Sequence, residues 1–280
     1  MTIEAPGKVN LTLRVLGRRE DGFHEIETLM VPITLADRLE ITLRAGRKIT
    51  LTCSDPSLPG DESNLAHRAA AAFAKQTGLD FGLDIHIEKN IPHGAGLGGG
   101  SSDAACVLVA LDRLLETNFE ATELEKIAAA IGSDIPFFIR RQPAVCRGRG
   151  EILEAAGAVP EAKILLVKPP FPIPTAWAYQ AWSASEKSLA TFQQFHGYIP
   201  LTNDLEAPVF SKYLLLPVLK EALRIHPSVS AAMMSGSGST IFAILQDEAD
   251  GIEEWIHREF GPTFQIVRSR LDTRLGHLFL

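Results

Sequence analysis

Alternation of apolar and polar residues predicts β-strands in both halves of the chain. Leu83 to Glu88 alternates in this way, and Val9, Leu11 and Leu13 repeat the same spacing near the start. A period of two places such side chains on one face of a sheet. We therefore expect extended segments at 3–15, 37–43, 49–53, 83–88, 144–153, 163–167, 241–245 and 264–269.

Apolar residues three or four positions apart predict helices between these strands. One helix should run from Asn64 to Gln76, because Asn64 can cap its first turn and Gly78 can end it. A second should follow the serine pair at 101–102, with Ala104, Leu108, Leu111 and Leu115 on one face. A third should run over 121–131 and stop at Gly132. Strands mixed with helices predict the α+β class.

The chain is long enough for two lobes. At 280 residues it exceeds one typical domain and can bury a large core. The segment 155–161 is small and contains Gly and Pro, so we expect one domain at 1–155 and a second at 156–280. Each half carries a glycine-rich turn, which predicts a binding cleft between the lobes.

Composition narrows the classes of function. The net charge of −7 gives no basic field for nucleic acid, and no feature indicates an obligate protein partner. The three cysteines are widely spaced, and Glu4 and Lys8 interrupt any signal peptide, so we expect reduced thiols and a cytoplasmic protein.

Two further kinds of site are not expected. The 22 positions of 225–246 hold no Lys, Arg, Asp or Glu, but His226, Pro227 and a Ser-Gly run break them. The segment is therefore interpreted as a helix end, a loop and a strand, and no membrane span is expected. The eight histidines lack zinc-ligand spacing.

The segment 91–104 carries the strongest chemical signal. Five glycines stand within the seven positions from Gly94 to Gly100, and Ser101 and Ser102 follow before a helix begins. Glycine permits positive φ and close approach of a ligand to the backbone. A helix N-terminus adds unpaired N–H groups and a positive dipole end. We interpret the segment as a phosphate-binding loop rather than a linker, with Ser101 and Ser102 as N-cap hydroxyls that could also face Mg²⁺.

Two familiar phosphate-binding devices fit this loop poorly. Gly94 to Gly99 satisfies G-x-G-x-x-G, but a dinucleotide site needs a second strand ending in an acidic residue about 20 positions later. Here that stretch is still helical, and Asp112 lies inside it. A Walker A loop is excluded because no Gly-Lys-Ser or Gly-Lys-Thr follows.

Three motifs, spread in order along the chain, resemble the GHMP kinases. They are Ala5-Pro6-Gly7-Lys8-Val9-Asn10-Leu11, the glycine loop preceded by Pro92, and Met234-Ser235-Gly236-Ser237-Gly238-Ser239-Thr240. Further segments resemble the branch that phosphorylates 4-diphosphocytidyl-2-C-methyl-D-erythritol in the non-mevalonate isoprenoid pathway, and this likeness spans essentially the whole chain. They are Asp21-Gly22-Phe23-His24-Glu25, Gly98-Gly99-Gly100-Ser101-Ser102-Asp103, Gly132-Ser133-Asp134-Ile135-Pro136, Ile173-Pro174-Thr175 and Asn203-Asp204. Phe23 replaces the tyrosine that this branch often has, which removes a hydroxyl.

The resemblance implies a two-lobed kinase that uses ATP and Mg²⁺. The N-terminal lobe should resemble ribosomal protein S5 and the C-terminal lobe ferredoxin, with the active site in the cleft. The ATP-binding residues implied are Asn64, Leu65, Lys89, Pro92, His93, Gly94, Ala95, Gly96, Leu97, Gly98, Gly99, Gly100, Ser101 and Ser102. The sequence names no protein ligand of Mg²⁺, because the oxygens of ATP could hold most of it.

Lys8 and Asp134 are the candidate catalytic residues. From spacing alone, Asp134 or Ser133 would cap the helix that contains Pro136, and Lys8 could equally be a surface lysine of its strand. The resemblance instead implies that Asp134 is the general base. It also implies that Lys8 pairs with Asp134 and with the acceptor hydroxyl, lowering the hydroxyl pKa.

The implied acceptor site is a small-molecule pocket. Asn10 could hydrogen-bond a pyrimidine edge, and Phe23 and His24 could line it. The resemblance implies that Tyr179 stacks on the base. Because Trp177 and Trp182 are its neighbours, Tyr179 could equally be an ordinary aromatic residue of the core. The other residues implied are Thr175, Gly236, Ser237 and Gly238. Competing hypotheses are another small-molecule kinase, such as homoserine or mevalonate kinase, and a sensor that has lost catalysis.

Overall fold

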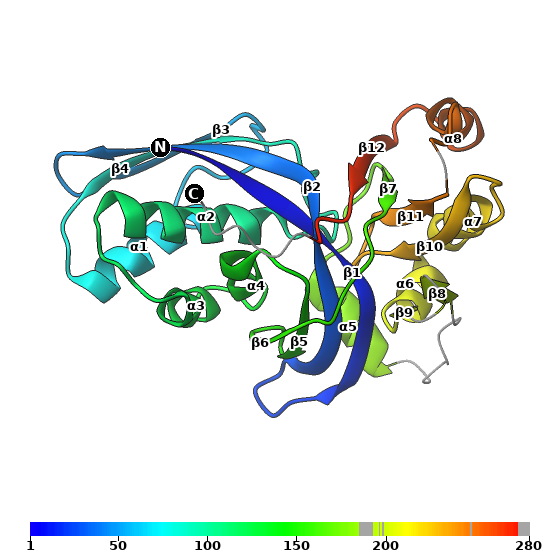
Figure 1. The fold of residues 1–280 in the computed structure, drawn as a ribbon, viewed down its shortest axis with the longest axis horizontal. Helices are drawn as coiled ribbons and strands as arrows, with labels where there is room; N and C mark the ends of the chain where they lie inside the picture. The colour runs from blue at the N-terminus through cyan, green and yellow to red at the C-terminus, as the bar shows by residue number, and fades with distance from the viewer. Residues whose placement is uncertain (185–192, 196, 198, 247, 274–280) are drawn as a thin grey trace.

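Two β-sheets and eight helices make up the part of the chain that the structure describes. The structure is a computed structural model and describes residues 1–184, 193–195, 197, 199–246 and 248–273. The helices are α1 (Leu65–Thr77), α2 (Gly99–Leu114), α3 (Ala121–Ala129), α4 (Ile135–Arg140), α5 (Thr175–Ala184), α6 (Glu206–Lys212), α7 (Leu215–Arg224) and α8 (Ile252–Phe260). Figure 1 shows α1 to α4 on one side of the molecule and the smaller sheet with α7 and α8 on the other.

The larger sheet has the strand order β3-β4-β2-β1-β9-β8, with β5 joined to β2 and β6 joined to β5. Its strands are β1 (Thr2–Arg18), β2 (His24–Arg44), β3 (Ile49–Cys53), β4 (Gly82–Glu88), β5 (Ala144–Gly148), β6 (Ile152–Ala155), β8 (Gln193–Phe195) and β9 (Ile199–Asn203). One face carries a core in which Phe73 of α1, Leu108 of α2 and Phe137 of α4 pack with strand residues such as Leu39 and Ile85. Because apolar side chains of the helices and the sheet bury each other, this face is closed to water.

The smaller sheet is antiparallel, with the order β10-β11-β7-β12. Its strands are β7 (Lys163–Lys168), β10 (Val229–Met234), β11 (Ile241–Leu245) and β12 (Gln265–Arg270). Leu219 of α7 and Ile256 of α8 pack on one face. The other face contributes Leu166 and Phe242 to a cluster that also contains Leu11 of β1. The two lobes therefore share an apolar layer, which fixes the geometry of any site between them.

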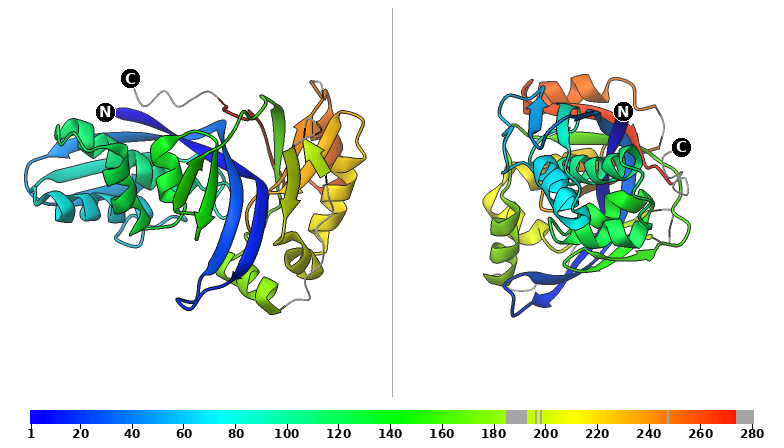
Figure 2. Two further views of the ribbon diagram at one scale, coloured as in Figure 1. Left: turned by 60° about the horizontal axis from the view of Figure 1, so that its bottom comes forward. Right: turned by 90° about the vertical axis from the view of Figure 1, so that its left-hand side faces the viewer.

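The hairpin of β1 and β2 is the longest feature of the fold and extends beyond the body of the molecule (Figure 2). Its turn is closed by a hydrogen bond from Arg19 N to Phe23 O of 2.8 Å. The Asp21 carboxylate accepts from Phe23 N at 3.1 Å, a side-chain contact that stabilises a tight turn. His24 begins β2 and lies against α5, where its Nε2 is 2.6 Å from Ser183 Oγ. The hairpin thus carries Phe23 and His24 towards the second lobe.

Several sequence-based boundaries need correction. The strand expected at 144–153 is two strands, β5 and β6, because the chain turns at Gly148 and Gly150. The strand expected from 37 begins at His24, and β10 was not expected at all. The serine pair does not cap α2: Gly98 is the N-cap, and both serines lie inside the first turn. By contrast, α1 has the predicted caps, Asn64 and a left-handed Gly78.

Candidate active site

A cavity of about 870 Å³ lies where the glycine loop, the β1–β2 hairpin, α5 and the second glycine turn meet. Nearly all of the predicted site residues line it. They include Lys8, Asn10, Phe23, His24, Asn64, Leu65, Lys89, the whole run from Pro92 to Ser101, Asp134, Thr175, Tyr179, Gly236 and Ser237. Two predicted residues, Ser102 and Gly238, lie outside the lining. One cavity therefore brings together segments up to 229 positions apart in the sequence, from Lys8 to Ser237.

The glycine loop has the close approaches that only glycine allows. Gly96 has φ of +75°, and a Cβ there would lie 2.1 Å from Ser235 O. Gly98 has φ of +73°, and a Cβ there would lie 2.7 Å from the ring of Phe138. The loop leads directly into the N-terminus of α2, which lines the cavity. Such a backbone fits a phosphate group. The buried Ser102 hydroxyl beside it has no hydrogen-bond partner among the described residues.

The second glycine turn packs directly against the first. Ser235 Oγ donates to Gly96 O at 3.0 Å, and Thr240 N donates to Ala95 O at 3.3 Å. Asn203 fixes the second turn, since its Nδ2 donates to Met234 O at 2.8 Å and to Gly236 O at 2.7 Å. These contacts hold the two lobes together at the floor of the cavity.

Lys8 is buried at the centre of the site, with only 4 % of its surface exposed. Its Nζ donates to Asn10 Oδ1 at 2.6 Å and to Gly96 O at 3.0 Å, and lies 4.0 Å from Asp134 Oδ2. Burial lowers the pKa of Lys8, while the charge of Asp134 opposes that shift. The surface-lysine alternative is therefore wrong.

Asp134 occupies the N-cap position of α4, but its side chain makes no capping hydrogen bond. The capping alternative is thus wrong for this carboxylate. About a third of the side chain is exposed, so the carboxylate is open to the cavity on one side and faces Lys8 on the other. A carboxylate held beside a buried ammonium can accept a proton from a hydroxyl placed between them.

Asn10 has an internal partner at each end of its amide. Its Oδ1 accepts from Lys8, and its Nδ2 donates to Thr28 Oγ1 at 2.8 Å. The residue is almost fully buried. These contacts make Asn10 a support for Lys8, and a contact with a pyrimidine stays a prediction.

Aromatic rings form the opposite wall. The rings of His24 and Tyr179 have centroids 5.1 Å apart, and the ring of Trp182 lies 5.9 Å from that of His24. Burial, and then the charge of Arg18, lowers the pKa of His24, so the imidazole is neutral near pH 7. Tyr179 packs against the core of the second lobe and also lines the cavity, and its stacking on a base stays a prediction. Phe23 is half exposed at the hairpin tip.

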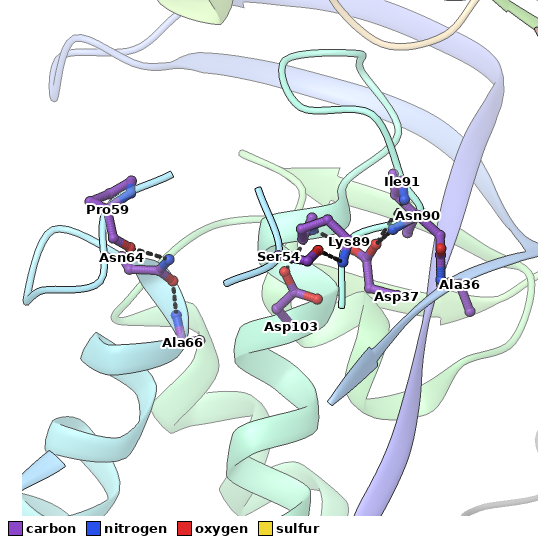
Figure 3. A network of polar contacts seen from close by, with 10 residues as sticks. All are labelled: Ala36, Asp37, Ser54, Pro59, Asn64, Ala66, Lys89, Asn90, Ile91 and Asp103. Carbon is purple, nitrogen blue, oxygen red and sulfur yellow. Dashed lines mark hydrogen bonds and ion pairs between the residues drawn. The ribbon is translucent and has the colours of Figure 1, made fainter. Parts of the chain in front are cut away.

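The predicted nucleotide side rests on a network of polar contacts (Figure 3). Asn64 caps α1 by accepting from Ala66 N at 3.0 Å, and its Nδ2 donates to Pro59 O at 2.9 Å. Lys89 pairs with Asp37 and, at 2.8 Å, with Asp103. Asp37 Oδ1 accepts from the backbone N–H groups of residues 90 and 91 at 2.6 and 2.7 Å. The network therefore ties the start of the glycine loop to the first turns of α2.

Two carboxylates share one ammonium in this network, and all three side chains are buried. Burial, together with the charge of Asp37, raises the pKa of Asp103 to about 7 despite the attraction of Lys89. Burial opposes the charge of Lys89, but the two carboxylates outweigh it and raise the pKa of the amine. The resemblance implied Lys89 as an ATP-binding residue and gave no sign of this network, because Asp37 and Asp103 meet it only in three dimensions.

The raised pKa predicts a pH-dependent difference between the wild type and Asp103→Asn. An acid whose pKa rises from 3.8 to about 7 on folding binds its proton more tightly in the folded state. The stability of the wild type relative to the variant should then fall as pH rises from about 4 to 7, by on the order of 1–4 kcal/mol. Urea unfolding of both proteins at pH 5 and 8 measures this. A relative gain for the wild type at pH 8 would mean that Lys89 outweighs desolvation.

Comparisons with known proteins fit this geometry. Residues 64–142 match the profile described as GHMP kinases N terminal domain, and residues 187–261 match GHMP kinases C terminal. A 4-diphosphocytidyl-2-C-methyl-D-erythritol kinase of Methylacidiphilum infernorum is 46 % identical over 246 residues, 87 % of this chain and 86 % of the relative. The chain belongs to this family of GHMP kinases. A second member, from Syntrophotalea carbinolica, is 41 % identical over 97 % of this chain and 94 % of its own length.

Solved structures agree with the family. A crystal structure of 4-(cytidine 5'-diphospho)-2C-methyl-D-erythritol kinase superposes with a TM-score of 0.81 at 33 % identity, covering 97 % of this chain and 99 % of that one. A homoserine kinase from Cytophaga hutchinsonii reaches 0.68 at 16 % identity, covering 97 % of this chain and 94 % of its own, and so shares the fold. The two-lobed α+β GHMP kinase fold is confirmed. This GHMP kinase is an enzyme that uses ATP on a small-molecule substrate.

The remaining expectations concern membranes and metals. None of the helices in the described part of this GHMP kinase is long and apolar enough to cross a membrane. Among the same residues, no group of three or more His, Cys, Asp or Glu side chains could hold a metal ion.

Proposed function

We propose that this kinase transfers the γ-phosphoryl group of ATP to the 2-hydroxyl of 4-diphosphocytidyl-2-C-methyl-D-erythritol, a step of the non-mevalonate isoprenoid pathway. The observation that carries the proposal is the Lys8–Asp134 pair, 4.0 Å apart, in the same cavity as the glycine loop and the aromatic wall. The names of the relatives support this acceptor.

In this proposal the glycine loop holds the phosphates of ATP. The backbone N–H groups of the loop and the N-terminus of α2 face the triphosphate, and the domains 1–155 and 156–280 close around it. Mg²⁺ bound with ATP would neutralise phosphate charge, and Ser101, which lines the cavity, would be the hydroxyl to hold it. The adenine ring would lie against Asn64, Leu65 and Lys89, which line the cavity.

Asp134 acts as the general base in this proposal. Its carboxylate takes the proton of the 2-hydroxyl as that oxygen bonds to the γ-phosphorus, and the bond to the β-phosphate oxygen breaks to release ADP. Lys8 stabilises the developing alkoxide, because its Nζ lies 4.0 Å from Asp134 Oδ2 and so faces the hydroxyl that Asp134 deprotonates. Asn10 holds Lys8 in place.

The acceptor site is the aromatic end of the cavity. The cytosine ring would lie between Phe23 and Tyr179, with His24 as its hydrogen-bonding partner. Base–aromatic stacking contributes about 1–3 kcal/mol per ring. Thr175, Gly236 and Ser237 lie near the substrate phosphates, and the Thr175 and Ser237 hydroxyls are 3.0 Å apart.

ADP release tests the acceptor. The purified protein with Mg²⁺ and ATP should release ADP with 4-diphosphocytidyl-2-C-methyl-D-erythritol and not with mevalonate, homoserine or galactose. These three are matched alternatives, because kinases with the same fold phosphorylate them. ADP release with another acceptor would support kinase activity but would contradict the proposed binding of a cytidyl group in the cavity. No ADP release with any of the four compounds would favour the hypothesis of a sensor that has lost catalysis.

A further inference from the structure

The turn between β5 and β6 brings a charged residue to the cavity that the sequence analysis did not single out. Arg149 lines the cavity, and its guanidinium carbon lies 4.7 Å from the centroid of the Phe23 ring. The next residue, Gly150, lies beside the proposed base, since a Cβ there would be 3.3 Å from Asp134 Oδ1. The turn between β5 and β6 therefore contacts Phe23 at the hairpin tip through Arg149 and lies beside the proposed base through Gly150.

Arg149 is held by its own turn and keeps donors available. Its backbone N–H donates to Glu151 Oε2 at 2.6 Å, while its Nε is 3.7 Å from Glu151 Oε1, beyond hydrogen-bond distance. Among the described residues, none accepts a hydrogen bond from the guanidinium, and the side chain is 29 % exposed. Asp21 across the hairpin tip is the other carboxylate that it influences. Both carboxylates orient the cation without consuming its N–H groups.

The two lysines that line the cavity already have hydrogen-bond or ion-pair partners within the protein. Lys8 donates to two internal oxygens beside Asp134, and Lys89 is paired with Asp37 and Asp103. A nucleoside diphosphate brings about two negative charges into a chain whose own net charge is −7. Among the described residues that line the cavity, Arg149 is therefore the cation with donors left for that group.

We propose that Arg149 binds the diphosphate of the acceptor and so selects for a nucleoside diphosphate over the nucleoside alone. The inference rests on the proposed function, which puts the base at Phe23 and Tyr179 and the reacting hydroxyl at Asp134. The diphosphate joins those two parts of the acceptor, and the β5–β6 turn reaches both, with Arg149 against Phe23 and Gly150 beside Asp134. A guanidinium can hold phosphate oxygens with two N–H groups at once while its flat face stays on an aromatic ring.

Binding of cytidine, CMP and CDP to Arg149→Met separates phosphate recognition from stacking. The variant should bind CDP about 10- to 100-fold more weakly, the range for a lost charge-assisted hydrogen bond, and cytidine within twofold of the wild type. The KM for the acceptor should rise by a similar factor, while the KM for ATP should not change. Arg149→Lys should recover part of the lost CDP affinity, because lysine keeps the positive charge but lacks the planar guanidinium that donates two parallel hydrogen bonds.

Arg147→Met is the matched control. Arg147 lies on the same hairpin, pairs with Glu27 and Glu154, and is outside the cavity lining, so its loss should leave every affinity unchanged. Equal weakening of cytidine and CDP by Arg149→Met would overturn the proposal, because Arg149 would then act only through Phe23. Unchanged binding of CDP would also overturn it. A wild type that binds CDP more tightly than cytidine but does not phosphorylate the cytidyl acceptor would instead reject the proposed function.

Discussion

Asp134→Asn should lower turnover about 10²- to 10⁴-fold, a loss of roughly 3–5 kcal/mol of transition-state stabilisation. The amide keeps the shape of the side chain but accepts no proton at neutral pH, so the acceptor hydroxyl loses its base. Nucleotide affinity should be preserved, because the side chain makes no capping bond to α4 and takes no part in the ion pairs of Lys89 with Asp37 and Asp103. Steady-state ADP release and titration with ADP measure the two quantities separately.

A matched control is Asp84→Asn. Asp84 is exposed on β4, where it pairs with Arg44 at 2.6 Å, and it does not line the cavity. Its replacement should leave turnover unchanged, since surface ion pairs contribute little. An Asp134→Asn enzyme with turnover within threefold of the wild type would remove Asp134 from the mechanism.

Lys8→Met should lower turnover by a factor similar to that of Asp134→Asn. Methionine fills nearly the same volume in a site that is 4 % exposed, but it removes the charge opposite Asp134 and the donors to Asn10 Oδ1 and Gly96 O. Without that ammonium the developing alkoxide is not stabilised, and Asp134 no longer faces a cation. Single-turnover rates of the two single variants and the double variant give the measurement.

The double variant should be little slower than either single variant, because the two residues act as one unit on one proton. Losses that multiply fully would show that Lys8 and Asp134 contribute through separate steps. Lys163→Met provides the control, because Lys163 is exposed on β7, pairs with Glu248 and does not line the cavity. Its turnover should equal that of the wild type.

Local sequence patterns were sufficient to predict the helices and strands whose ends or alternation depend on neighbouring residues. Asn64 and Gly78 mark the ends of α1 because a cap depends on residues within one turn. The alternation of β4 was visible because one face is buried and the other is not. In β10, residues 231–234 are buried on both faces, so no period of two marks the strand. Pro32 obscured the middle of β2, since it cannot donate to the ladder.

The same division holds for the site. The sequence by itself determined the family-specific motifs, the loop whose glycines approach other backbone atoms, and the candidate pair Lys8 and Asp134. Only the tertiary structure decided that Lys8 is buried against Gly96 O, that Asp37 and Asp103 enclose Lys89, and that Arg149 lies over Phe23. Motifs are local in sequence, because the backbone conformation they need involves neighbouring residues. Burial, charge pairing and pKa depend on which distant segments meet, and the packing of two sheets against a shared apolar layer settles that.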